Sequence, residues 1–238
     1  MSETDTLFRE VLSQEVLLAL WVTLKLAAFT TAALMAIAPP LAWWLARSRS
    51  KLRPLIEALT SLPIILPPTV VGFYLLLMMA PDGILGRPWS SLTGNSLAFS
   101  FSGLVVGSVV YSLPFVVQPL TSSFRTMDEK LLEAAATLGA NARQRFLKVA
   151  IPLHKRTLVA AATLGFAHTV GEFGVILMIG GNLPGTTRVL SILIFDQVEA
   201  LQYQSAHATS LLLLCLAGVF LSVVYWGQRR APGPARST

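Results

Sequence analysis

Long apolar runs separated by short polar segments dominate the hydropathy pattern of this chain. Five runs are each long enough to cross a hydrocarbon core, which requires about 20 apolar residues. They cover residues 16–46, 55–80, 97–120, 157–181 and 206–227. The pattern predicts an all-α integral membrane protein of about five transmembrane helices, because only helices and closed barrels satisfy the backbone inside lipid.

The first apolar run is too long for one simple span. Its 31 residues would extend roughly 46 Å as a helix, against a hydrocarbon core of about 30 Å. Two arrangements fit this length: one long span, or a span at residues 26–46 preceded by an interfacial helix at residues 16–24. The sequence does not decide between them. Pro39 and Pro40 are expected to break the span near its inner third.

The polar segment at residues 126–152 carries helical periodicity of its own. Thr126 and Glu129 have the T-x-x-E spacing of a capping box, which predicts a helix start. Gly139 follows an apolar stripe that ends at Leu138. Because glycine adopts a left-handed conformation at little cost, the first helix is expected to stop at about Leu138.

A second helix is expected to complete this segment. Asn141, with Gln144 three residues later, predicts its N-terminal cap, and Pro152 is expected to end it. The segment is therefore predicted to be a helix-turn-helix hairpin that lies outside the bilayer.

The charge distribution predicts how the chain is oriented. The formal charge of +6 would suggest nucleic acid in a soluble protein, but 54% of the residues are hydrophobic and only 13% are charged. Fourteen of the 18 Lys and Arg residues lie at residues 47–53, 125–156 and 229–236. By the positive-inside rule these segments are cytoplasmic. The N-terminal segment, residues 1–15, is then expected to be extracytoplasmic, and the tail at 228–238 cytoplasmic. The expected partner of the excess basic residues is the lipid bilayer and not nucleic acid.

The sequence offers little catalytic chemistry. P-loop, H-E-x-x-H, G-x-S-x-G and C-x-x-C motifs are absent, which argues against ATP binding, metal binding and hydrolysis by this chain. We therefore expect no catalytic residue, no metal and no cofactor of its own. The energy for any transport must come from another chain or from a gradient.

Glu172 is an ionisable residue inside an apolar run, and such residues are functional candidates. His168 precedes it by four residues and is expected on the same helical face. The pair could relay protons in a secondary transporter, or it could be a hydrogen-bonded brace between helices. The candidate pathway residues share this span or the proline-rich second run: Pro67, Pro68, His168, Gly171, Glu172 and Gly174.

The hairpin resembles a known family. Glu133-Ala134-Ala135, Gly139 and the Val149-to-Pro152 run have the spacing of the EAA loop in permease subunits of bacterial ABC importers. The resemblance implies a type I importer permease fold, with coupling helices that dock into a groove of a separate ATPase subunit. The residues implied in coupling are Glu133, Ala134, Ala135, Gly139, Arg143, Phe146 and Pro152.

Further segments are similar to the molybdate permeases of that family. They are residues 62–72, 171–174 and 180–188. The resemblance implies a non-catalytic permease subunit of a bacterial inner membrane importer for molybdate or tungstate, with sulfate or thiosulfate as the alternative substrate. Implied partners are a second copy of the chain, a dimer of ATPase subunits that holds ATP and magnesium, and an extracytoplasmic molybdate-binding protein.

Two segments of the outer side are long enough to meet a binding protein. They are residues 81–96 and 182–205, and they hold Arg87 and Arg188, two of the three cations predicted to lie on that side. Arg87, Asn182 and Arg188 are the residues expected to take part in docking, where arginine could also steer an anion electrostatically.

Overall fold

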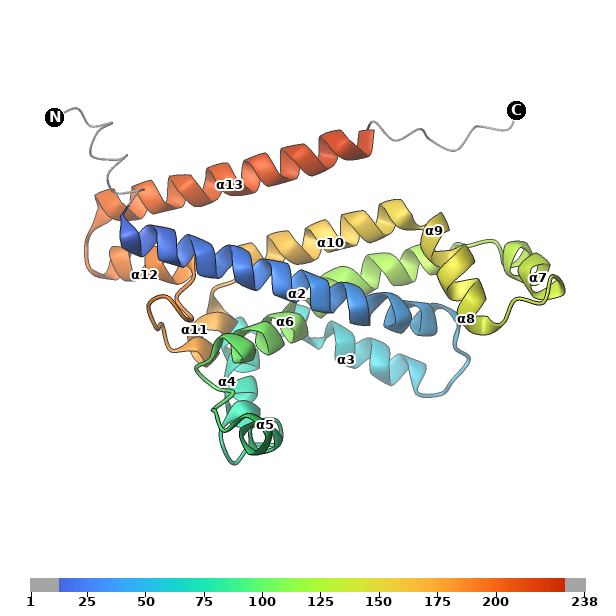
Figure 1. The fold of residues 1–238 in the computed structure, drawn as a ribbon, viewed down its shortest axis with the longest axis horizontal. Coiled ribbons are helices and arrows are strands. Elements are labelled where there is room, and N and C mark those ends of the chain that lie inside the picture. Colours follow the sequence, from blue (N-terminus) through green and yellow to red (C-terminus); the bar gives the residue numbers. More distant parts are fainter. Residues whose placement is uncertain (1–12, 230–238) are drawn as a thin grey trace.

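The computed structural model describes residues 13–229 and shows only helices and connecting segments over that range (Figure 1). The expectations for residues 1–12 and 230–238 lie outside the described residues. The predicted all-α class is confirmed. The helices are α2 (Gln14–Arg47), α3 (Arg53–Ile65), α4 (Pro68–Met79), α5 (Gly86–Thr93), α6 (Phe101–Arg125), α7 (Glu129–Thr137), α8 (Ala142–Gln144), a π-helical turn (Arg145–Ala150), α9 (Ile151–Leu153), α10 (Lys155–Val170), α11 (Gly174–Gly180), α12 (Leu190–Glu199) and α13 (Tyr203–Arg229).

Three helices, α2, α6 and α10, form the centre of the bundle (Figure 1). Leu34 and Leu45 of α2 pack with Val116 and Phe124 of α6 in one fully buried cluster. α13 lies along the outside of this bundle, where it contacts α10 and α12. Because α13 is apolar and little of it is covered by other helices, its outer face is suited to contact with lipid or with another membrane protein.

The first apolar run forms a single helix. The Ser13 side chain accepts a hydrogen bond from the Val16 backbone N–H, and α2 then continues through Pro39 and Pro40 to Arg47. The predicted break at Pro39 and Pro40 is therefore wrong. Val16 and Ala19 are buried in a cluster that also includes residues of α12. The structure therefore favours one long helix over a span with a separate interfacial segment.

The second and fourth apolar runs are each broken. α3 and α4 meet at an angle of 117°, and α10 and α11 meet at 60°. Among residues 13–229, three helices are long and apolar enough to cross a membrane, and up to five if each bent pair counts as one span. α4 and α5 project from the side of the bundle as a result of the first bend (Figure 1).

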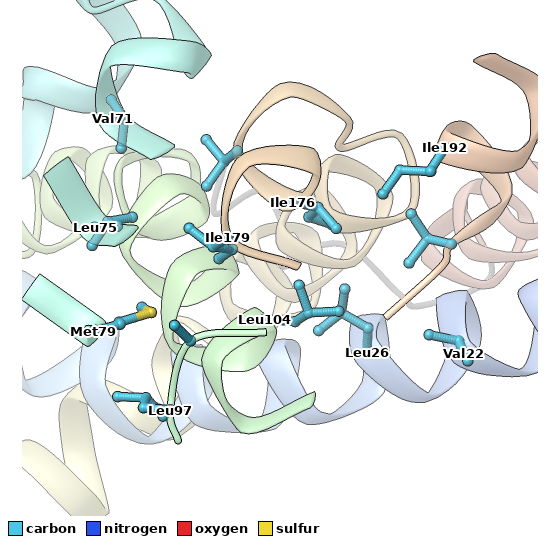
Figure 2. Close-up of a cluster of buried hydrophobic side chains, with 13 residues drawn as sticks. Val22, Leu26, Val71, Leu75, Met79, Leu97, Leu104, Ile176, Ile179 and Ile192 are labelled. Carbon is cyan, nitrogen blue, oxygen red and sulfur yellow. The ribbon is translucent and has the colours of Figure 1, made fainter. Parts of the chain in front are cut away.

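The two broken helices pack against each other and against the bundle. A Cβ on Gly174 would lie 2.7 Å from Cβ of Pro68, and one on Gly72 would lie 2.7 Å from Cβ of Met178, so α4 and α11 touch through glycine. Figure 2 shows the apolar cluster that surrounds this contact, with Leu26 of α2 and Leu104 of α6 facing the broken helices. This cluster fixes the segment between α10 and α11, which contains Glu172.

Candidate functional site

The hairpin begins two residues later than the sequence suggests. α6 continues to Arg125, and the Thr126 hydroxyl donates to the Ser123 carbonyl at 2.9 Å, so Thr126 ends α6. Asp128 is the cap of α7, since its carboxylate accepts the Lys130 backbone N–H at 3.0 Å. The predicted capping box at Thr126 and Glu129 is wrong because the hydroxyl is already used by the preceding helix.

The turn of the hairpin agrees with its sequence. Gly139 has φ of 85°, the left-handed conformation that was expected after Leu138. The Asn141 carboxamide accepts the Gln144 N–H, and the Gln144 carboxamide accepts the Asn141 N–H, both at 2.9 Å. The predicted cap of the second helix is therefore confirmed.

Pro152 does not end the second helix. The chain passes from α8 into the π-helical turn and then into α9, and the break comes at His154, with φ of −101° and ψ of 20°. Pro152 lies inside this continuous run, in α9, which directly follows the π-helical turn. A π-helical turn widens the backbone locally, so it lets the chain reach this position without a clash.

Arg47 holds the hairpin against the bundle. One guanidinium nitrogen donates to the Glu129 carboxylate at 3.0 Å, and the other donates to the backbone carbonyls of Phe124 and Met127 at 3.1 and 3.0 Å. The charge count had placed Arg47 only as a topology signal. A cation at the last position of a span, beside aromatic residues, was the clue in the sequence.

Phe146 of the hairpin points into the same contact. Its ring centroid lies 5.6 Å from that of Trp43, and Trp43 also meets Phe124 edge to face at 5.4 Å. Phe146 therefore contributes to attachment of the hairpin. We will refer to Trp43, Arg47, Phe124 and Phe146 as the Arg47 clamp.

The outer surface of the hairpin is open. No residue of α7 is buried, and Leu138 is 88% exposed. Glu133, Ala134 and Arg143 are also exposed, whereas Ala135 is partly covered. Between the hairpin and the end of α2 lies a cavity of about 320 Å³, and Glu133 and Arg145 contribute to its lining. Exposed leucines on a polar hairpin are typical of a surface that another protein covers.

Glu172 lies in the break between α10 and α11. The residue is only 4% exposed, and neither carboxylate oxygen has a hydrogen-bond partner among the described residues. Its backbone carbonyl accepts the Ser191 hydroxyl at 2.6 Å. The hydroxyl of Ser108 lies close to the carboxylate and is likewise buried without a partner of good geometry.

His168 belongs to a different set of contacts. Its Nδ1 lies 2.8 Å from the Ser112 hydroxyl of α6, and its ring stacks on Phe115 with centroids 4.0 Å apart. Because α10 ends at Val170, the expected pairing of His168 and Glu172 on one helical face is wrong, and no hydrogen bond joins them within residues 13–229. His168 links α10 to α6, whereas the Glu172 carboxylate forms no hydrogen bond to another described residue.

Gly171, Gly174 and the proline pair shape this break. Gly171 ends α10, and Gly174 begins α11 against Pro68. Pro67 stands immediately before α4, so it forms the corner at which α3 and α4 diverge. The structure thus brings the sequence-predicted pathway residues of both broken runs to one level of the bundle.

At the opposite end from the hairpin, Arg188 is engaged by three side chains. It pairs with Glu15 of α2, donates to the Asn182 carboxamide oxygen at 2.6 Å, and lies 3.7 Å from the Asp196 carboxylate. Asn182 also donates to Asp196 at 2.8 Å. Two of the three docking candidates, Asn182 and Arg188, are therefore brought together, whereas Arg87 lies on α5.

The comparisons with known proteins agree on one family. Residues 38–231 match the model of the binding-protein-dependent transport system inner membrane component. A molybdenum transport system permease protein of Azotobacter vinelandii is 48% identical, with 93% of this chain and 98% of that protein aligned. A sulfate transport system permease protein of Synechocystis is 31% identical, over 80% of this chain and 68% of that protein.

A solved structure shares the fold. The crystal structure of a bacterial ABC transporter for import of the acidic polysaccharide alginate superposes with a TM-score of 0.78 at 18% identity. The alignment covers 97% of this chain and 84% of that one. At this identity the match shows the fold alone, and it is the fold of an ABC importer permease.

Proposed function

Because the chain belongs to the family of binding-protein-dependent transport system inner membrane components, we propose that it is the permease subunit of an ATP-driven molybdate importer. The observation that carries the proposal is the likeness to the Azotobacter permease, which extends over nearly the whole of both chains. Tungstate is the second candidate substrate, because it is a tetrahedral dianion of the same kind. Sulfate and thiosulfate are less favoured by the weaker likeness to the sulfate permease.

The hairpin is the proposed docking site for an ATPase subunit. Its Leu138, Glu133 and Arg143 are exposed, and the Arg47 clamp ties the hairpin to α2 and α6. Movement of the docked ATPase would then be passed directly to two central helices. ATP and magnesium would be bound by that partner, so this chain needs no cofactor.

An external energy source suits this cargo. Moving a dianion inward against an inside-negative potential of 100 mV costs about 4.6 kcal/mol, twice the value for a single charge, before any concentration gradient. A second copy of this chain would complete the pathway, and an extracytoplasmic binding protein would supply affinity. The docking surface proposed for it is the end of the bundle with Asn182 and Arg188, together with the loop that carries Arg87.

The substrate assignment predicts selective uptake. Vesicles that contain the permease, its ATPase and its binding protein should accumulate molybdate only when ATP is enclosed. Tungstate should compete, and sulfate should compete poorly. Vesicles without the binding protein are the control. Sulfate uptake as efficient as molybdate uptake would remove the substrate assignment and leave the importer assignment intact.

The proposed orientation places residues 81–96 outside and the hairpin inside the cell. Single cysteines can test this, because Cys215 is the only native cysteine. In a Cys215→Ser background, Asn95→Cys should react with an impermeant thiol reagent in intact cells. Arg143→Cys should react only after the membrane is opened. The reverse pattern would overturn the orientation and with it the cytoplasmic ATPase.

A further inference from the structure

A polar groove lies between α3 and α6, near the hairpin end of the bundle. Its volume is about 230 Å³, and Leu45 and Val117 form its apolar floor. We call it the α3–α6 groove. Its polar lining residues are Glu57, Thr60, Ser61, Gln118, Thr121, Ser122 and Arg125.

The position of this groove on a membrane helix is informative. Gln118, Ser122 and Arg125 have helical spacing along one face of α6, and all three are exposed in the single chain. Polar residues on a spanning helix face a water-filled space or another protein, since lipid contact is costly. The groove is therefore expected to face water or another protein and not lipid.

The groove contains donors in several directions. Gln118 Nε2 donates to the Ser61 hydroxyl at 3.3 Å, so both groups are held at the groove wall. Thr121 is only 5% exposed, and its hydroxyl has no hydrogen-bond partner within the part of the chain that the structure describes. An unused hydroxyl buried in the wall of a cavity is a group that a ligand can satisfy.

One ion pair controls the charge of the groove. A guanidinium nitrogen of Arg125 donates to both carboxylate oxygens of Glu57, at 2.9 and 3.0 Å. Arg53 lies 3.9 Å from the same carboxylate. The lining of the groove thus holds one arginine and one glutamate, and Glu57 neutralises the charge of Arg125 while their ion pair is formed.

We propose that the α3–α6 groove is a binding site for a tetrahedral oxyanion on its way out of the pathway. The proposal rests on the proposed function, because it takes the cargo to be an oxyanion. Arg125 would bind one edge of the anion, and the hydroxyls of Thr121 and Ser61 would donate to its other oxygens. Hydroxyl and guanidinium groups are the donors that tetrahedral oxyanions prefer.

Glu57 makes this site a weak one. An ion pair between side chains that are 39% and 43% exposed adds little stability, so an incoming dianion can replace the carboxylate. Once the pathway opens to water, Glu57 can pair with Arg125 again and release the anion. Weak binding at the exit fits a pathway in which the binding protein provides the affinity.

The test uses a reporter inside the groove. In the purified complex of permease and ATPase, Ser122→Cys in the Cys215→Ser background is modified with a negatively charged thiol reagent. Molybdate is added at matched ionic strength, up to millimolar concentration. It should slow modification of the reporter severalfold. Ser50→Cys, in the exposed loop before α3, is the matched control and should be unaffected.

Two charge variants, which should change molybdate binding in opposite directions, test the roles of Arg125 and Glu57. Arg125→Gln should abolish protection by molybdate, whereas Glu57→Gln should raise the apparent affinity for molybdate by about tenfold, because it removes a competing charge-assisted pair. A purely structural ion pair predicts instead that both substitutions disturb the complex equally. Co-purification of the ATPase checks that each variant is assembled.

The outcomes separate this inference from the function it rests on. If vesicles transport molybdate but molybdate protects neither the reporter nor the Glu57→Gln variant, the groove is not an anion site. Equal protection with Arg125→Gln would also overturn it. If the vesicles transport no molybdate at all, the proposed function fails first.

Discussion

Replacing Gly139 with valine should uncouple ATP hydrolysis from transport while the protein still inserts into the membrane. Gly139 has φ of 85°, and a Cβ added there would meet no atom within 4 Å. The obstacle is therefore the backbone conformation and not crowding. A left-handed conformation costs an ordinary residue about 1–2 kcal/mol, and a β-branched residue more, so the turn between α7 and α8 should open.

The matched control is Gly139→Asn, because asparagine tolerates the left-handed conformation far better than valine does. The measurement is the stimulation of ATP hydrolysis by the loaded binding protein. With valine it should fall about tenfold or more, and with asparagine it should stay near the wild-type level. Full stimulation in the valine variant would show that the geometry of this turn does not matter for coupling.

Replacing Gly103 with valine should remove most of the folded protein from the membrane. A Cβ at Gly103 would overlap the Leu97 carbonyl oxygen, which also accepts the Ser100 hydroxyl at 2.7 Å. A backbone carbonyl cannot move aside as a flexible side chain can. Crowding of this kind typically costs about 1–3 kcal/mol, and a rigid neighbour places it at the upper end. Because α6 is the central helix, its start affects the whole bundle.

Gly218→Val is the control for this substitution. A Cβ at Gly218 meets nothing within 4 Å, and the residue lies on the outer helix α13. The two variants should be compared by the amount of monodisperse protein recovered in detergent and by its unfolding temperature. Equal recovery and equal unfolding temperatures would contradict the predicted role of the Gly103 contact.

Local features of the hairpin could be predicted from the sequence. The turn at Gly139 and the cap formed by Asn141 and Gln144 depend on residues within a few positions of one another, and both were predicted correctly. Thr126 failed as a cap because the length of α6, a property of the neighbouring element, decides how its hydroxyl is used. Rules based on residues a few positions apart cannot predict that two neighbouring helices compete for the same hydroxyl.

Features that join distant segments could not be predicted. Arg47 reaches Glu129 and Phe124, which are 82 and 77 positions away, and no local pattern links them. The same holds for the intramembrane carboxylate: periodicity placed His168 and Glu172 on one face, but the helix ends at Val170 before Glu172 is reached. The hydropathy pattern predicted the apolar runs, and the sequence shows the prolines in them. Neither predicted the angles at which the helices break.

The long first helix has a mechanical consequence. α2 has 34 residues and is one unbroken helix of roughly 51 Å. Glu15, at one end, pairs with Arg188, and Arg47, at the other, grips the hairpin. Because α2 is attached at both ends of the bundle, it acts as a lever between them. A tilt of about 10° about its middle would displace each end by about 4 Å in opposite directions, so neither face can move without the other.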